Sequence, residues 1–169
     1  MYADLVSQFA KTLASLDAIL AKAEAHATVR GFPVDNFVGM RLAPDMLPFW
    51  RQVTIACDAA KAGAAAWAQV DAPKFEDNET TVAELRARIA KTIAFLDSIP
   101  ADAYAKTQND TIVKIAFPPG KAMFARDAAL SRSVPNFFFH ATTAYAILRG
   151  GGVPIGKMDF LGELKLFDQ

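Results

Sequence analysis

Two histidines are present in the chain, and one of them, His140, stands inside a mostly apolar run at residues 135–149. Burying an imidazole with neither a hydrogen bond nor a ligand costs about 2 kcal/mol or more. Asn136 and Thr143 lie four residues before and three after His140, a spacing that places all three side chains on one stripe of a helix. We therefore expect Asn136 and His140 to point into the same interior layer. His140 then either anchors a polar network, which is the favoured interpretation, or helps to form a binding site.

A metal site is the first chemical hypothesis for these residues. His26 lies one position from the apolar stripe of the first predicted helix, and it approaches His140 if the first and last helices are neighbours. A catalytic zinc ion takes three protein ligands and keeps one open position, so a carboxylate from Asp58 or Asp45 has to complete the set. The metal candidates are therefore His26, Asp58 and His140, with zinc, nickel or manganese as the divalent ion. In the alternative interpretation, Asp58 forms an ordinary surface pair with Lys61.

A small-molecule pocket is the second hypothesis. Arg41, Asp45 and Gln52 gather near the start of the second predicted helix, where they are suitably placed to line the mouth of a pocket. Solvated charges at a helix end explain the same pattern.

Four segments with helical periodicity position these residues. The first covers residues 2 to about 29 and stops at Gly31. In the second, Asp45 is the expected N-cap, Pro48 lies in the first turn, and the helix continues to about residue 67. Residues 71–80 read as an exposed linker. The third starts with a capping box of Thr81 and Glu84, and runs to Pro100.

A short hairpin is predicted between the third and fourth helices, with strands at residues 111–117 and 121–126. The fourth helix is expected to start near Ser131 or Ser133 and to end at Arg149 before three glycines. Residues 153–169 then carry enough apolar side chains that we expect them to pack across the end of the bundle. The sequence therefore predicts an all-α, up-and-down four-helix bundle in a single domain of residues 1–169, with a small β-hairpin between helices three and four.

Composition narrows the classes of function. The 169 residues are 53% hydrophobic, and 18 basic residues balance 18 acidic ones. This balance argues against a nucleic-acid partner, and no apolar run of about 18 residues is present to cross a membrane. The single cysteine fits a reducing compartment, so the cytoplasm is expected. A net charge near zero gives little repulsion between copies of the chain, which also favours a homodimer.

Several segments resemble an uncharacterised bacterial family, a domain-of-unknown-function group similar to the DinB and YfiT bundles. They are RLAPDM at 41–46, DAAK at 58–61, PNFFFH at 135–140, YAILR at 145–149 and GKMDFLG at 156–162. The wider superfamily implies a four-helix bundle, frequent dimers and, in many members, a metal ion held by one histidine of helix two and two histidines of helix four at i, i+4. In some relatives this metal serves thiol-dependent transferase or detoxification chemistry.

The sequence departs from that metal motif. Helix four keeps only His140, with Asn136 and Ala144 four residues to either side, and helix two offers Gln52 and Asp58 but no histidine. We therefore expect a degenerate metal site in a small-molecule-binding or structural protein. A divalent-metal-dependent transferase or hydrolase, with the metal activating water or a thiolate, and a dimerising scaffold are the alternatives.

Overall fold

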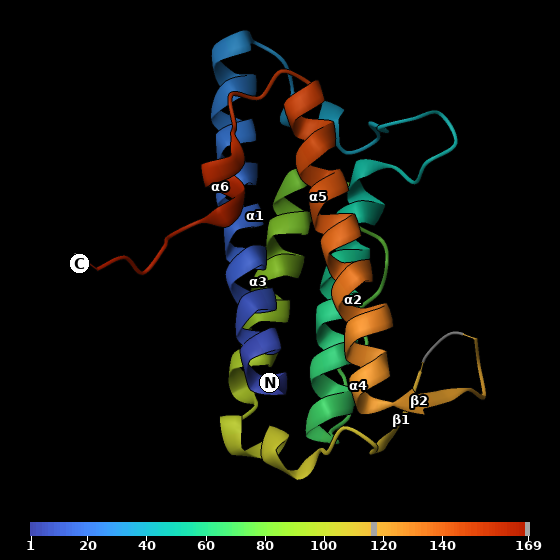
Figure 1. The fold of residues 1–169 in the computed structure, drawn as a ribbon. Coiled ribbons are helices and arrows are strands. Elements are labelled where there is room, and N and C mark those ends of the chain that lie inside the picture. Colours follow the sequence, from blue (N-terminus) through green and yellow to red (C-terminus); the bar gives the residue numbers. More distant parts are fainter. Residues whose placement is uncertain (116–117, 168–169) are drawn as a thin grey trace.

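Four long helices form the body of the protein (Figure 1). The computed structural model describes residues 1–115 and 118–167. The long helices are α1 (Tyr2–Arg30), α2 (Phe49–Ala68), α3 (Val82–Ser98) and α5 (Val134–Gly150). Shorter elements are the 3-10 helices η1 (Val34–Phe37) and η2 (Ala101–Lys106), the strands β1 (Ile112–Lys114) and β2 (Ala122–Phe124), the helices α4 (Ala125–Ala128) and α6 (Lys157–Leu161), and the π-helix η3 (Ala129–Ser133). The predicted helical fold with one small hairpin is confirmed, with α4 and α6 as additions.

The connection between α2 and α3 differs from the prediction. At one end of the molecule, the backbone N–H of Val82 donates to Asp35, which follows α1. At the other end, the Thr107 hydroxyl, just after α3, donates to the carbonyl of Trp67 near the end of α2. Because both helices start at the same end, they run in the same direction, as Figure 1 shows. The expected up-and-down order is therefore wrong, and residues 69–81 return along the length of the bundle.

Two helix boundaries follow the predicted chemistry. Gly31 ends α1 with a φ of 72°, a left-handed conformation that glycine adopts without strain. At the start of α3, the Thr81 hydroxyl accepts from the N–H of Glu84 at 3.2 Å, and the Glu84 carboxylate accepts from the N–H of Thr81 at 3.0 Å. The predicted capping box is therefore confirmed.

The start of α2 was predicted wrongly. Asp45 is exposed and does not cap the helix, which begins at Phe49 after Pro48. The N–H of Phe49 donates to the carbonyl of Met40 at 2.7 Å, and the N–H of Trp50 donates to that of Val38 at 3.2 Å. Backbone carbonyls of the preceding loop thus satisfy the first donors of the helix, so it needs no side-chain cap.

Large aromatic side chains fill the core, and small ones let the helices approach. Phe9 on α1 packs against Phe137 on α5 and Trp67 on α2, with ring centroids 4.4 and 6.1 Å apart. The face that α2 turns to its neighbours is rich in fully buried alanines, namely Ala56, Ala60 and Ala64. Because small residues allow close helix packing, α2 makes its most extensive contact with α5. This seam between α2 and α5 holds Gln52 and His140.

The hairpin and the helix after it fit the prediction only in part. β1 and β2 are antiparallel, with Val113 opposite Met123, and residues 116 and 117 of the predicted strand lie outside the described residues. The helical chain begins at Ala125 through α4 and η3, earlier than expected, because residues 129–133 form a π-helical turn that joins α4 to α5.

The C-terminal segment fits the expectation only in part, because α6 lies along the side of α1 and the chain after it extends away from the bundle (Figure 1). Val153 and Ile155 are buried, but Leu166 and Phe167 are 84% and 88% exposed. Residues 168 and 169 of the predicted packing segment lie outside the described residues. Within the described chain, no helix combines the length and apolarity needed to cross a bilayer.

Candidate functional site

The central feature of the α2–α5 seam is a hydrogen bond between His140 Nδ1 and Gln52 Oε1, 2.7 Å long. The amide of Gln52 is itself oriented, because its Nε2 donates to the carbonyl of Leu47 at 2.9 Å. Gln52 Oε1 is therefore the acceptor, and His140 Nδ1–H is the donor. In the neutral imidazole this arrangement leaves a lone pair on Nε2.

Burial keeps that imidazole neutral. His140 is 8% exposed and Gln52 is 1% exposed. Removal from water lowers the pKa of His140 below its ordinary value of 6.5, and the positive charge of Arg51 lowers it further. The ring at neutral pH is thus a hydrogen-bond acceptor at Nε2, or a base.

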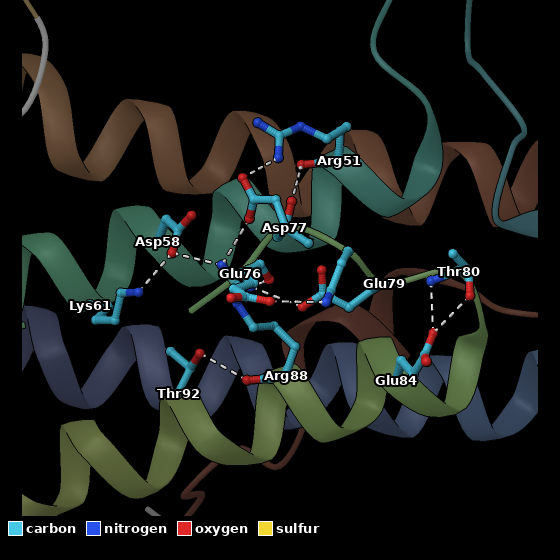
Figure 2. Close-up of polar contacts among 12 residues, drawn as sticks. Arg51, Asp58, Lys61, Glu76, Asp77, Glu79, Thr80, Glu84, Arg88 and Thr92 are labelled. Carbon is cyan, nitrogen blue, oxygen red and sulfur yellow. Dashed lines mark hydrogen bonds and ion pairs between the residues drawn. The ribbon is translucent and has the colours of Figure 1, made fainter. Parts of the chain in front are cut away.

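A second polar cluster surrounds Arg88 on α3 (Figure 2). The Arg88 side chain is 2% exposed and donates to Asp58 on α2 at 2.9 Å. It also donates to two carboxylates of the 69–81 linker, Asp77 at 3.2 Å and Glu79 at 2.9 Å, and to the carbonyl of Glu76 at 2.9 Å. Because one buried guanidinium on α3 binds both the linker and α2, this cluster fastens the linker to α2 and α3.

Two further cations neutralise the carboxylates of the Arg88 cluster. Lys61 Nζ lies 3.0 Å from Asp58, and Arg51 forms an ion pair with Asp77. The pKa of the Asp77 carboxyl is held below its usual value by Arg51 and Arg88, against the opposing effect of burial. Arg51 thereby connects the two clusters, since it also acts on His140. The ion pair with Asp77 thus ties Arg51, the neighbour of Gln52 on α2, to the linker.

The predicted stripe of three polar residues on α5 is only partly correct. His140 is buried, but Asn136 is exposed and lines a small pocket of about 40 Å³ against Gly63 of α2 and β1. The small side chains of α2 at this level leave room that Asn136 does not fill. Thr143 is buried, and its hydroxyl donates to the carbonyl of Phe139 at 2.7 Å within its own helix.

Three further predicted residues lie away from the seam. His26 is half-buried at the far end of α1, where its ring centroid lies 6.0 Å from that of Phe32. Arg41 donates to the carbonyl of Met46 within the loop before α2. Asp45 is exposed in the same loop. Only Gln52 and His140 of the predicted residues are therefore in direct contact.

The residues present do not fit the three-ligand metal site implied by the resemblance. Among the residues that the structure describes, no three His, Cys, Asp or Glu side chains gather closely enough to hold a metal ion. Nδ1 of His140 is taken by Gln52, and Asp58 is bound to Arg88 and Lys61. His26, Asp58 and His140 thus each contact different partners and do not form one ligand set.

Sequence reasoning missed Arg88, Asp77 and Glu79. One signal was available, because Arg88 falls within the buried stripe of α3 between Leu85 and Ile89. A charged residue at a core position requires a partner of opposite charge, and the linker before α3 is rich in carboxylates.

Comparison with known proteins agrees with the fold. A crystal structure described as that of a DinB family member protein from Shewanella denitrificans is similar to this chain, with 40% sequence identity and a TM-score of 0.90. The similarity covers 97% of this chain and 93% of that one. No curated protein matches the chain significantly.

The family comparison covers most of the sequence. The model of the family described as "Domain of unknown function (DUF1993)" matches residues 1–161. The chain therefore belongs to the DUF1993 family and shares its fold with a DinB family member.

Proposed function

We propose that this protein is a four-helix-bundle protein that binds a small, largely apolar molecule at the α2–α5 seam, with His140 Nε2 accepting a hydrogen bond from the ligand. The observation that carries the proposal is the 2.7 Å contact between His140 Nδ1 and Gln52 Oε1. A structural hydrogen bond alone needs only one nitrogen. Here the bond to Gln52 fixes the tautomer of the ring, so the second nitrogen, Nε2, is an oriented hydrogen-bond acceptor.

The surroundings favour a neutral planar ligand with an N–H or O–H donor. Phe139, beside His140, is 55% exposed, and its ring stands perpendicular to the imidazole with centroids 5.1 Å apart. Aromatic surface supplies apolar contact area, while a lone pair in a poorly hydrated place supplies specificity.

Indazole and 1-methylindazole test this proposal as a matched pair of probes, since only indazole carries the N–H donor. We expect indazole to shift the NMR signal of the His140 Cε1–H, and to bind about five- to tenfold more tightly than 1-methylindazole, the effect of one neutral hydrogen bond of about 1 kcal/mol.

Two variants complete the test. His140→Phe should remove the preference for indazole, and Asn136→Ala, an exposed change one helical turn away, should leave it unaltered. Equal binding of the two probes, or no binding of either, contradicts the proposal.

We also propose that the protein works in a reducing compartment, such as the cytoplasm. The support is its single cysteine, Cys57, which is fully buried on α2 and unpaired.

A further inference from the structure

The β-hairpin buries one of its faces and exposes the other. Val113 of β1 is 5% exposed and belongs to the core, and Met123, opposite it on β2, packs against the core as well. Because side chains alternate along a strand, Ile112 and Phe124 point the opposite way, and they are 71% and 52% exposed. These two residues lie opposite each other in the register of the sheet. The outer face of the hairpin therefore holds a pair of large apolar side chains in water.

The base of the hairpin is held by the backbone. The N–H of Ala125 donates to the carbonyl of Thr111 at 2.8 Å, and the N–H of Arg126 donates to that of Asn109 at 3.1 Å. These bonds join the start of α4 to the chain just before β1. Figure 1 shows the two strands extending sideways from this base, away from the four long helices. The outer face is thus presented to the surroundings on an anchored element.

Positive charge gathers in this part of the chain. Residues 106–132 contain five basic and two acidic side chains, although the charges of the whole chain are balanced. Lys114 lies on the outer face itself, opposite Ala122, and Lys121 directly precedes β2. In the described part of the chain, the ion pairs lie along the long helices, α6 and the 69–81 linker. Lys114 and Lys121 therefore keep their charge available for an anionic surface.

We propose that the outer face of the hairpin binds reversibly to the surface of an anionic lipid bilayer. Ile112 and Phe124 enter the headgroup region, while Lys114 beside them pairs with a lipid phosphate. Apolar side chains next to lysine suit this boundary, because the lysine stem stays in apolar surroundings and its charge meets the headgroups. Lys121 adds to the attraction of the anionic surface. This inference is independent of the ligand proposed for His140.

The size of the outer face favours a bilayer over a protein partner. Two strands of three residues cover about 100 Å², whereas a stable protein complex buries about 800 Å² of each partner. A bilayer requires no complementary shape, since shallow insertion of a few apolar groups and the attraction of several lysines act together. A nucleic acid would attract the same lysines, but its phosphates offer no apolar contact to Ile112 and Phe124.

Co-sedimentation of the full chain with lipid vesicles measures the binding. At low salt we expect the chain to bind vesicles of equal parts phosphatidylglycerol and phosphatidylcholine at least tenfold more tightly than vesicles of phosphatidylcholine alone. Lys114→Glu should weaken binding to the anionic vesicles at least fivefold. Lys91→Glu, the same change of charge at an exposed position of α3, should weaken it less than twofold. Absence of binding to the anionic vesicles, or equal losses in the two lysine variants, overturns the proposal.

A second pair of variants tests the apolar contact. Replacing Ile112 and Phe124 together by serine should weaken binding to the anionic vesicles at least tenfold. Val29→Ser is the matched control, because Val29 is 86% exposed on α1 and distant from the hairpin. Circular dichroism checks that each variant keeps the helical fold. A folded double variant that binds as well as Val29→Ser contradicts the proposal.

An environment-sensitive dye distinguishes insertion into lipid from attraction to any polyanion. Ala122→Cys places a nitrobenzoxadiazole label on the outer face and leaves both apolar side chains intact, and Val29→Cys is the control. Cys57 is fully buried and does not compete for the label. Anionic vesicles should at least double the fluorescence at position 122 and leave that at position 29 unchanged, whereas duplex DNA and polyaspartate should have no effect. No rise at position 122, or an equal rise with DNA or polyaspartate, contradicts lipid binding.

Discussion

His140 of α5 donates a hydrogen bond to Gln52 of α2 across 88 residues of sequence, at a distance of 2.7 Å. The bond joins the two helices that pack together most extensively, and both side chains are almost fully buried. Because Gln52 also donates to the carbonyl of Leu47, the contact links the loop before α2 to the centre of α5. This pair is the most specific polar feature of the α2–α5 seam.

Replacing Gln52 tests the energetic value of the pair. Gln52→Leu keeps most of the volume but leaves the His140 N–H without its acceptor, so we expect a loss of about 1–3 kcal/mol in the free energy of unfolding. Urea denaturation measures this loss. Asn136→Ala, at an exposed position of α5, should change stability by less than about 0.5 kcal/mol. A Gln52→Leu effect as small as that of the control would mean that the bond is not formed in solution.

The titration of His140 is the second prediction. Burial and Arg51 lower its pKa in the native protein below 6.5, whereas the unfolded chain binds this proton near pH 6.5. Between the two pKa values the unfolded state holds more protons, so the contribution of His140 to stability is complete above pH 6.5 and declines as the pH falls toward the native pKa. An NMR titration of the His140 Cε1–H should show the lowered pKa, and Arg51→Gln should raise it. A native pKa at or above 6.5 contradicts this explanation.

Two arginines of α3 should differ sharply in their contribution to stability. Arg88 is 2% exposed and pairs with Glu79, whose side chain is 9% exposed, so Arg88→Met leaves one nearly buried carboxylate without its cation and should cost about 3 kcal/mol. Arg86, two residues earlier, pairs with Asp17 and Glu24, but its side chain is 35% exposed. Arg86→Met should therefore cost about 1 kcal/mol or less.

Chemical denaturation of the two arginine variants compares them directly. Limited proteolysis adds a local readout, since release of residues 69–81 should make that linker more sensitive in Arg88→Met only. Similar losses in both variants would show that the Arg88 cluster does not fasten the linker.

The thiol of Cys57 should be inert in the native protein. It is fully buried, and burial raises its pKa to about 12, against the weaker opposing effects of Thr92 and Arg88. Because the thiolate is the reactive form, a disulfide reagent should label one thiol per chain in urea and almost none in buffer. Rapid labelling of the folded protein would mean that the α2–α3 contact opens readily.

Local signals in the sequence predicted those elements that depend on neighbouring residues. The capping box of Thr81 and Glu84 and the end of α1 at Gly31 were found because both depend on chemistry within a few residues. Burial of His140 was predicted for the same reason, from the apolar run around it.

Features that depend on distant parts of the chain were not predicted. Asp45 failed as the α2 cap because carbonyls of Val38 and Met40 satisfy the first donors of the helix. Asn136 is exposed at the rim of a small pocket that it lines together with Gly63 of α2. The linker that returns between the parallel helices α2 and α3 is held by the Arg88 cluster, whose members come from three segments. Periodicity within one helix contains none of this information.

The tautomer of His140 tests the central claim most directly. A long-range ¹H–¹⁵N NMR spectrum at pH 7 separates a protonated ring nitrogen from one that carries a lone pair. We predict that the Gln52–His140 bond keeps the proton on Nδ1 and the lone pair on Nε2, and that Gln52→Leu relaxes this preference. A wild-type spectrum with the proton on Nε2, or with both nitrogens protonated at neutral pH, would contradict the account.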